Sequence, residues 1–256
     1  MLSHPSTATL LALAAFACAS PAAPALNYTD LEVYPYQPAQ PNEVEIENRY
    51  TYTQSGSHDA EPPENNRGIQ RNSAEFVYGF TDHTEAALYL DYAKAEDASW
   101  THAAKRARIR HRFAEKGEYP VDIGLYLELE RPYHEDNTLE GEIKVLLEKD
   151  FGRWTFDINP AFSKVLNGIE TSQGWGFGYA AAAVYRWNET WHPRLDFFGD
   201  LGRLSHFAPR QEQIHLISPA VDVKIARGVK AGVGIAFGLT RASEQRLIRT
   251  RLEFEF

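Results

Sequence analysis

Apolar and charged residues alternate along most of the chain after residue 42. The last stretch is the clearest case, because successive side chains of a β-strand point to opposite faces. One face would carry Ile248, Thr250, Leu252, Phe254 and Phe256, and the other Leu247, Arg249, Arg251, Glu253 and Glu255. The pattern predicts strands with one apolar and one mostly charged face. The edge strand of a soluble β-sandwich is the alternative environment for such a strand.

The alternation recurs in about twelve segments, as in a closed outer-membrane barrel with an even number of strands. These segments are residues 43–52, 68–79, 86–92, 106–113, 121–129, 139–147, 154–162, 175–187, 195–201, 217–225, 229–239 and 245–256. Short connections such as 115–118 alternate with long polar ones such as 55–67. Tilted strands of about ten residues are long enough to cross a bilayer. We therefore predict an all-β fold, a closed antiparallel transmembrane barrel with short periplasmic turns and longer extracellular loops.

Large aromatic residues gather near the short-turn ends of the predicted strands. The residues concerned are Trp154, Trp187, Trp191, Phe254 and Phe256. Such clustering is typical of the aromatic belt at a membrane interface, here the periplasmic one. A soluble β-sandwich would give large aromatic residues no reason to gather at the ends of strands. Pro160 and Pro219 fall inside predicted strands, where proline usually marks a bulge or an edge and makes the register uncertain.

The first residues resemble a secretory signal peptide. An apolar run from Leu10 to Ala19 precedes small residues, although no Lys or Arg precedes the run. We predict a signal peptide over 1–22, with cleavage between residues 19 and 25, a Pro-rich extended periplasmic lead-in over 23–42, and the barrel over 43–256. The only cysteine, Cys18, lies in the leader, where acylation of a lipoprotein is the alternative. The expected location is the cell outer membrane.

Composition excludes some classes of protein. A net charge of −9 argues against general nucleic-acid binding, which needs a basic face. A mean hydropathy of −0.44 would suit a soluble protein, but lipid-facing and lumen-facing residues cancel in such an average. No later segment reaches the roughly 18 apolar residues of a membrane helix. A membrane-spanning chain of this kind must cross with strands.

The predicted lumen carries many charges. Arg106, Arg108, Arg110 and Arg112 form a ladder on one strand. Neighbouring strands supply the carboxylates Glu85, Asp91, Asp122, Glu128, Glu130 and Glu142. One hypothesis is a transverse field across a water-filled pore that selects small charged or polar solutes. The other is a lumen closed by mutually satisfied ion pairs, since a barrel of this size lies between filled and open ones.

Enzymatic readings have less support. A lipid-modifying barrel enzyme needs a serine and a histidine within hydrogen-bond reach. Ser205 with His206 and Ser218 with His215 are the nearest pairs, and neither has the spacing that places both side chains on one strand face. We expect this protein to have no enzymatic activity, no metal site and no cofactor.

Several short segments resemble a known group of outer-membrane proteins. They are the segments 76–85 (FVYGFTDHTE), 149–154 (KDFGRW), 218–221 (SPAV) and 237–240 (FGLT), together with the terminal phenylalanine. They are similar to signatures of the meta-pathway phenol-degradation-like outer-membrane proteins, a family of transporter barrels. The resemblance implies a barrel for small molecules, hydrophobic ones among them. It transfers no catalytic residue, and we do not assign the arginine ladder to the family pattern.

The expected function is a passive channel or porin-like transporter for small molecules, with a charged lumen. A non-conducting structural envelope barrel and a lipid-modifying enzyme are the alternatives. Expected partners are outer-membrane lipid and, through the strand that ends at Phe256, the barrel-insertion machinery. The sequence names neither the solute nor the oligomeric state, and it leaves open whether the lead-in enters the lumen.

Overall fold

The computed structural model describes residues 26–29, 31–58, 66–133, 137–168 and 171–256. The predicted signal peptide, residues 1–22, lies outside these ranges. Within them, no helix is both long enough and apolar enough to cross a membrane.

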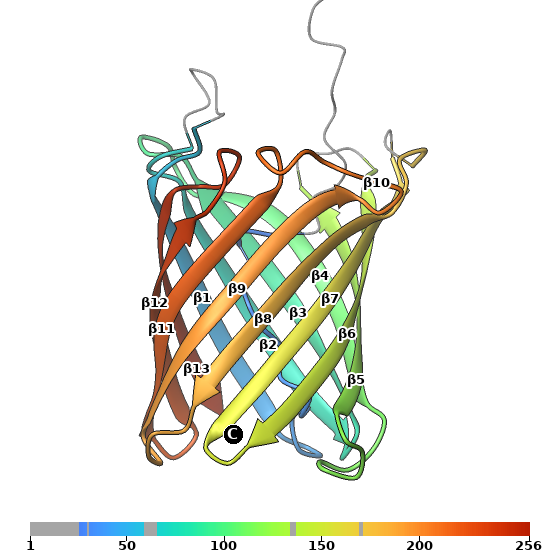
Figure 1. Ribbon diagram of the computed structural model, residues 1–256, viewed down its shortest axis with the longest axis vertical. Coiled ribbons are helices and arrows are strands. Elements are labelled where there is room, and N and C mark those ends of the chain that lie inside the picture. Colours follow the sequence, from blue (N-terminus) through green and yellow to red (C-terminus); the bar gives the residue numbers. More distant parts are fainter. Residues whose placement is uncertain (1–25, 30, 59–65, 134–136, 169–170) are drawn as a thin grey trace, which may run out of the picture.

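One antiparallel sheet curls round and closes on itself (Figure 1). Its strands are β1 (Val44–Ser55), β2 (Gln70–Thr81), β3 (Thr84–Lys94), β4 (Thr101–Arg112), β5 (Asp122–Pro132), β6 (Leu139–Phe151), β7 (Trp154–Asn167), β8 (Gly176–Tyr185), β9 (Trp191–Arg203), β10 (His206–Phe207), β11 (Ile214–Ala226), β12 (Val229–Gly238) and β13 (Arg246–Glu255). β13 pairs with β1 and β8 pairs with β9, so the wall has no free edge. β10 only extends the end of β9 as a two-residue ribbon. Twelve strands therefore form the wall, which confirms the predicted barrel.

Burial alternates along the strands as the sequence predicts. On β4, Ile109 is 51% exposed, whereas its neighbours Arg108 and Arg110 are 4% and 5% exposed. In an ordinary soluble protein, isoleucine would be inside and arginine outside. The inversion means that the apolar faces point outward and the charged faces point into the barrel.

Neither proline within a strand changes the register. β6 pairs with β7 at Lys144–Ala161 and again at Leu147–Ile158, with the ladder interrupted at Pro160 between them. β11 and β12 show the same interruption at Pro219. Pro160 stays paired with Tyr179 of β8, and Pro219 stays paired with Leu195 of β9. The missing N–H therefore costs ladder bonds on one side only.

The two ends of the barrel differ. Tight turns join β2 to β3, β6 to β7 and β11 to β12 at the end where the C-terminus lies (Figure 1). The connection from β4 to β5 at this end, predicted as a short turn over 115–118, spans residues 113–121, and the connections at the other end are of six residues or more. The predicted belt residues Trp154, Trp187, Trp191 and Phe256 are between 44% and 74% exposed at this turn end, and Phe254 is half-buried there. Their position agrees with the prediction, and contact with a membrane interface stays a prediction.

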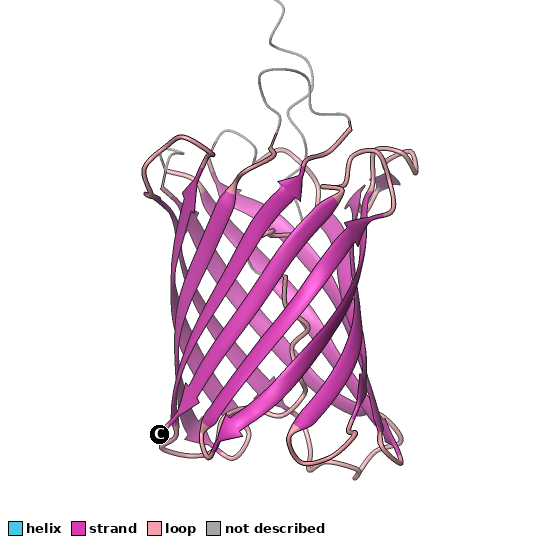
Figure 2. Cartoon of the chain, turned by 90° about the vertical axis from the view of Figure 1, so that its left-hand side faces the viewer, coloured by secondary structure: helices cyan, strands magenta, loops and turns pink. Residues whose placement is uncertain are grey.

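The lead-in runs through the interior of the barrel (Figure 2). We call residues 26–42, of which residue 30 is not described, the lumen segment. Gln40 to Glu43 form a turn closed by a hydrogen bond of 3.0 Å from the Glu43 N–H to the Gln40 carbonyl. Pro41 and Asn42, whose φ is +65°, supply the backbone of a type II turn. This turn reverses the chain into β1 at the turn end.

The sequence placed this segment on the periplasmic side of the barrel, without a core of its own. In the structure only its last residues reach the turn end, and the rest is packed against the wall. Leu26, Leu31 and Val33 join an apolar cluster with Ala180, Ala182, Phe198, Leu216, Ala236 and Leu247. The wall residues of this cluster form an apolar surface inside the barrel, and the apolar residues of the lumen segment cover it.

Candidate functional site: the charged lumen

All four side chains of the arginine ladder are buried inside the barrel, and each has carboxylate partners. Arg106 donates two hydrogen bonds to Asp91, from Nε at 2.7 Å and from Nη2 at 3.1 Å, and contacts Glu128 at 3.3 Å. Its guanidinium also lies 4.0 Å from the centroid of the Tyr89 ring. Bidentate pairing of this kind fixes a guanidinium plane as well as its charge.

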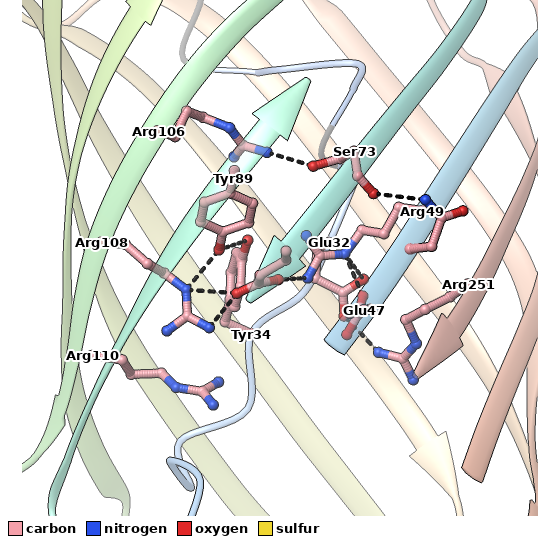
Figure 3. Close-up of polar contacts among 12 residues, drawn as sticks. Glu32, Tyr34, Glu47, Arg49, Ser73, Tyr89, Arg106, Arg108, Arg110 and Arg251 are labelled. Atoms are coloured by element: carbon pink, nitrogen blue, oxygen red, sulfur yellow. Dashed lines mark hydrogen bonds and ion pairs between the residues drawn. The ribbon is translucent and has the colours of Figure 1, made fainter. Parts of the chain in front are cut away.

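Arg108 is the centre of the ladder (Figure 3). It donates to Glu75 at 2.5 Å, to Glu85, and to the hydroxyl of Tyr89 at 2.6 Å. Arg110 shares Glu85 at 2.9 Å. Adjacent strands therefore alternate cations and carboxylates across the wall, which attract strongly where water is scarce.

Arg112 ends the ladder at the turn end. It contacts Glu115 at 2.7 Å and donates to the carbonyl of Asp82 at 2.6 Å. The hydrogen bond from Arg112 holds the pKa of the exposed Glu115 carboxyl below its usual value. This last rung ties two turns together.

Of the six predicted carboxylates, Glu85, Asp91 and Glu128 meet the ladder. The other three point inward but have other partners. Asp122 accepts a hydrogen bond of 2.6 Å from the Gly117 N–H, Glu130 accepts one of 3.3 Å from Asn27, and Glu142 lies 3.0 Å from Lys144.

Sequence reasoning missed Glu75, which binds both Arg108 and Arg49. It lies on β2, the most weakly patterned strand of the chain. Its register opposite Tyr89 would have indicated the inward face. The ladder is therefore part of a larger network that includes Glu75 and Arg49, and this part was not predicted from the sequence.

The lumen segment is attached to the wall at mid-height through Glu32 and Tyr34 (Figure 3). Glu32 lies 3.0 Å from Arg251 of β13 and 3.6 Å from Arg49 of β1. The backbone of Tyr34 exchanges two hydrogen bonds with the Asn159 amide of β7, of 2.8 and 3.1 Å. Anchors on opposite walls hold the segment across the lumen rather than along one side.

Further contacts bind the segment nearer the turn end. The Tyr36 N–H donates to Glu148 at 3.0 Å, and the Ala39 N–H donates to Glu85 at 2.5 Å. Arg110 donates to the carbonyl of Pro35 at 3.2 Å. A segment without a strand partner must satisfy its buried backbone groups in another way, and wall side chains do so here.

The space left beside the segment is uneven. A cavity of about 530 Å³ extends from rim residues such as Glu43 and Lys230 to Glu32 and Arg251 at mid-height. Two smaller spaces, of about 50 Å³ and 30 Å³, also border Glu32. The larger cavity therefore lies at the turn end, and the segment and its partners occupy the lumen at mid-height.

Neither serine–histidine pair forms a catalytic arrangement. Ser218 is fully buried on the inner face. His215 lies on the outer face, where it contacts the Tyr179 hydroxyl at 3.0 Å and Gln213 at 2.8 Å. Among the described residues, no hydrogen bond joins serine to histidine in either pair.

Comparison with solved structures places this architecture among known barrels. The COG4313 outer membrane channel from Pseudomonas putida F1 superposes with a TM-score of 0.62 at 14% identity, over 88% of this chain and 100% of that one. The chain described here therefore has the fold of an outer-membrane barrel. The KdgM porin in complex with disordered oligogalacturonate (TM-score 0.58, 8% identity, 83% and 99% coverage) and the NanC porin (0.53, 8%, 83% and 98%) are also similar. No protein-family model and no curated protein matches the chain.

At these identities the likeness concerns the fold. The similar structures are channels and porins of the outer membrane, which agrees with the broader part of the resemblance seen in the sequence. The narrower resemblance to the phenol-degradation-like family stays a prediction, as does the solute.

Proposed function

We propose that this protein is an outer-membrane channel for the passive passage of small charged or polar solutes, closed in the described state by its own lumen segment. The observation that carries the proposal is the cavity of about 530 Å³ inside a closed barrel. It ends at mid-height on Glu32, a residue of the segment and not of the wall. Because the lumen segment forms no strand of the wall, it can leave the lumen while the barrel stays closed.

The outward faces support location in the outer membrane. Apolar residues predominate on the outer surface of the strands, and an even-stranded barrel with short turns at one end fits a chain exported to that membrane. The solute class follows from the lumen, because charged walls favour polar solutes over the hydrophobic ones that the family resemblance implies. The KdgM porin, a structural neighbour, is described in complex with an oligogalacturonate, a charged sugar.

A non-conducting structural barrel is the second candidate. The small volumes of the two spaces that border Glu32 favour it. Single-channel recording of the refolded protein in planar bilayers separates the two. The channel proposal predicts small or intermittent current steps that become large when the segment is released. A folded protein without any current in either state would leave only the structural barrel.

Gly79 offers a way to disturb the segment from the wall. A Cβ atom at Gly79 would lie 1.9 Å from the carbonyl oxygen of Gln40, so Gly79→Ala must displace the end of the segment. We expect larger or more frequent current steps. Gly124→Ala is the matched control, because its Cβ would lie no closer than 3.1 Å to a neighbour. Equal currents in the two variants would contradict the prediction.

Replacing Arg110 tests the charge of the lumen. Arg110 lines the turn-end cavity and shares Glu85 with Arg108, so Arg110→Gln leaves a net negative charge there. We expect the reversal potential in a salt gradient to shift toward cation preference. Lys149→Gln removes a charge from the turn end of β6, away from that cavity, and should leave the preference unchanged. No shift for Arg110→Gln would refute a selective role for this end of the ladder.

A further inference from the structure

Charges on the outer surface of the barrel are distributed unequally. Among the described strand residues no Asp or Glu side chain is exposed, whereas Lys105 and Arg131 are exposed. Outward cations include Lys94, Lys105, Arg131, Lys164 and Arg246, which lie seven to ten residues from the turn end of their strands. With about 3.3 Å per residue and a tilt of about 40°, these residues reach roughly the height of a 25 Å apolar band. They therefore mark the membrane interface at the long-loop end.

Lys105 and Arg131 stand directly opposite each other on β4 and β5. Like charges in this position repel and destabilise a sheet. No ion pair to either side chain occurs among the described residues. We call these two residues the outer cationic pair. An anion held between them would convert repulsion into attraction.

An apolar groove of about 910 Å³ begins directly below this pair on the outer face. Ala107 and Leu129, each two positions from a member of the pair, line it. Gly141 deepens it, because a Cβ there would lie 2.9 Å from the Leu166 side chain. Most of the remaining lining is apolar and includes Leu88, Ile109 and Ile143, while the inward-facing residues Arg108, Glu128 and Glu142 also border it. Its shape and chemistry fit acyl chains.

Aromatic rings border the pair on the long-loop side. The His102 ring lies 5.2 Å from the Tyr92 ring and 5.1 Å from the Tyr133 ring, between centroids. Tyr133 is 63% exposed. Amphipathic rings of this kind are enriched at the level of lipid headgroups. Chains, charge and headgroup contacts thus follow one another in the order found in a single lipid molecule.

We infer that the outer cationic pair and the groove below it bind a lipid whose phosphate headgroup carries a net negative charge, in the leaflet at the long-loop end. Lys105 and Arg131 bind the phosphate, and the acyl chains lie between Leu88 and Leu166. Juxtamembrane Lys and Arg attract anionic lipids by this chemistry. The inference rests on the membrane location proposed above and is independent of channel activity.

The test compares thermal unfolding in vesicles of phosphatidylcholine with unfolding in vesicles that also contain phosphatidylglycerol or lipid A. A ligand that binds only the folded state raises its unfolding temperature. We expect a rise of several degrees for the unmodified protein and loss of most of this rise for Lys105→Gln/Arg131→Gln. In phosphatidylcholine alone the double variant should be at least as stable as the unmodified protein, because the repulsion is gone.

The matched control is Lys149→Gln/Arg227→Gln, which removes two positive charges at the turn end and should keep the full rise. Equal rises in the two double variants would overturn the proposal, and so would the absence of a rise in the unmodified protein. An equal rise caused by inorganic phosphate in phosphatidylcholine vesicles would show a site for the ion alone and would also overturn it. Bilayer currents should be the same in both double variants, so a failed channel proposal would be recognised separately.

Discussion

Deleting residues 26–39 is expected to raise the single-channel conductance severalfold. The deletion keeps residues 1–25, which contain the predicted signal peptide, and the turn from Gln40 to Glu43. It removes Glu32 and Tyr34, which close the lumen at mid-height, and joins the turn-end cavity to the far side. Because the segment contributes no strand to the wall, the barrel should still close. Planar-bilayer recording, with liposome swelling in small sugars as a second measurement, detects the change.

The control for this experiment must show that the variant is folded. A compact band of the unboiled protein on a gel, which shifts on boiling, provides this evidence. A second variant, Glu32→Gln with Asn159→Ala, keeps the chain length and weakens two anchors, so it should give intermediate currents. A folded deletion variant with unchanged currents would show that the segment is not the barrier.

Replacing Arg108 by methionine is expected to lower the free energy of unfolding by about 3 to 5 kcal/mol, the usual cost of breaking a buried ion pair. The Arg108 side chain is 3% exposed and neutralises Glu75 and Glu85. Methionine fills much of the same volume but leaves both carboxylates with fewer partners. Urea unfolding in vesicles, followed by tryptophan fluorescence, measures the loss.

Arg227→Met is the matched control, since Arg227 is exposed in the turn between β11 and β12. Its substitution should change the free energy of unfolding by less than about 0.5 kcal/mol. A similar loss in both variants would mean that the network around Arg108 contributes no more than a surface charge does.

The strands of the barrel wall were predictable because the alternation of apolar and polar residues is a local property of the sequence. Two-residue periodicity places Leu127 in hydrocarbon and Glu128 in the lumen without knowledge of any distant contact. Arg106 to Arg112 were assigned to the lumen by the same parity. Pairing between consecutive strands then follows from the short turns, and the prolines at 160 and 219 disturb only the ladder, not the parity.

The lumen segment was not predictable in this way. Its apolar residues Leu31 and Val33 show no repeat, and its partners Glu148 and Asn159 lie more than a hundred positions away along the chain. The signal that was present is chemical: an inner wall with Ala180, Ala182 and Leu247 in a charged lumen needs an apolar cover. Recognising it requires knowing which small residues share one interior surface, which only the closed barrel reveals.

Single spin labels along β5 test the central claim, that hydrocarbon contacts alternate residues of these strands. Labels at Ile123, Leu125, Leu127 and Leu129, in a chain whose Cys18 is replaced, should be readily relaxed by oxygen dissolved in the bilayer. Labels at Gly124, Tyr126 and Glu128 should be protected from it, since they face the lumen. A two-residue alternation in oxygen accessibility is the predicted result. Uniform accessibility, or protection of the leucines, would contradict the barrel in a membrane and every function proposed for it.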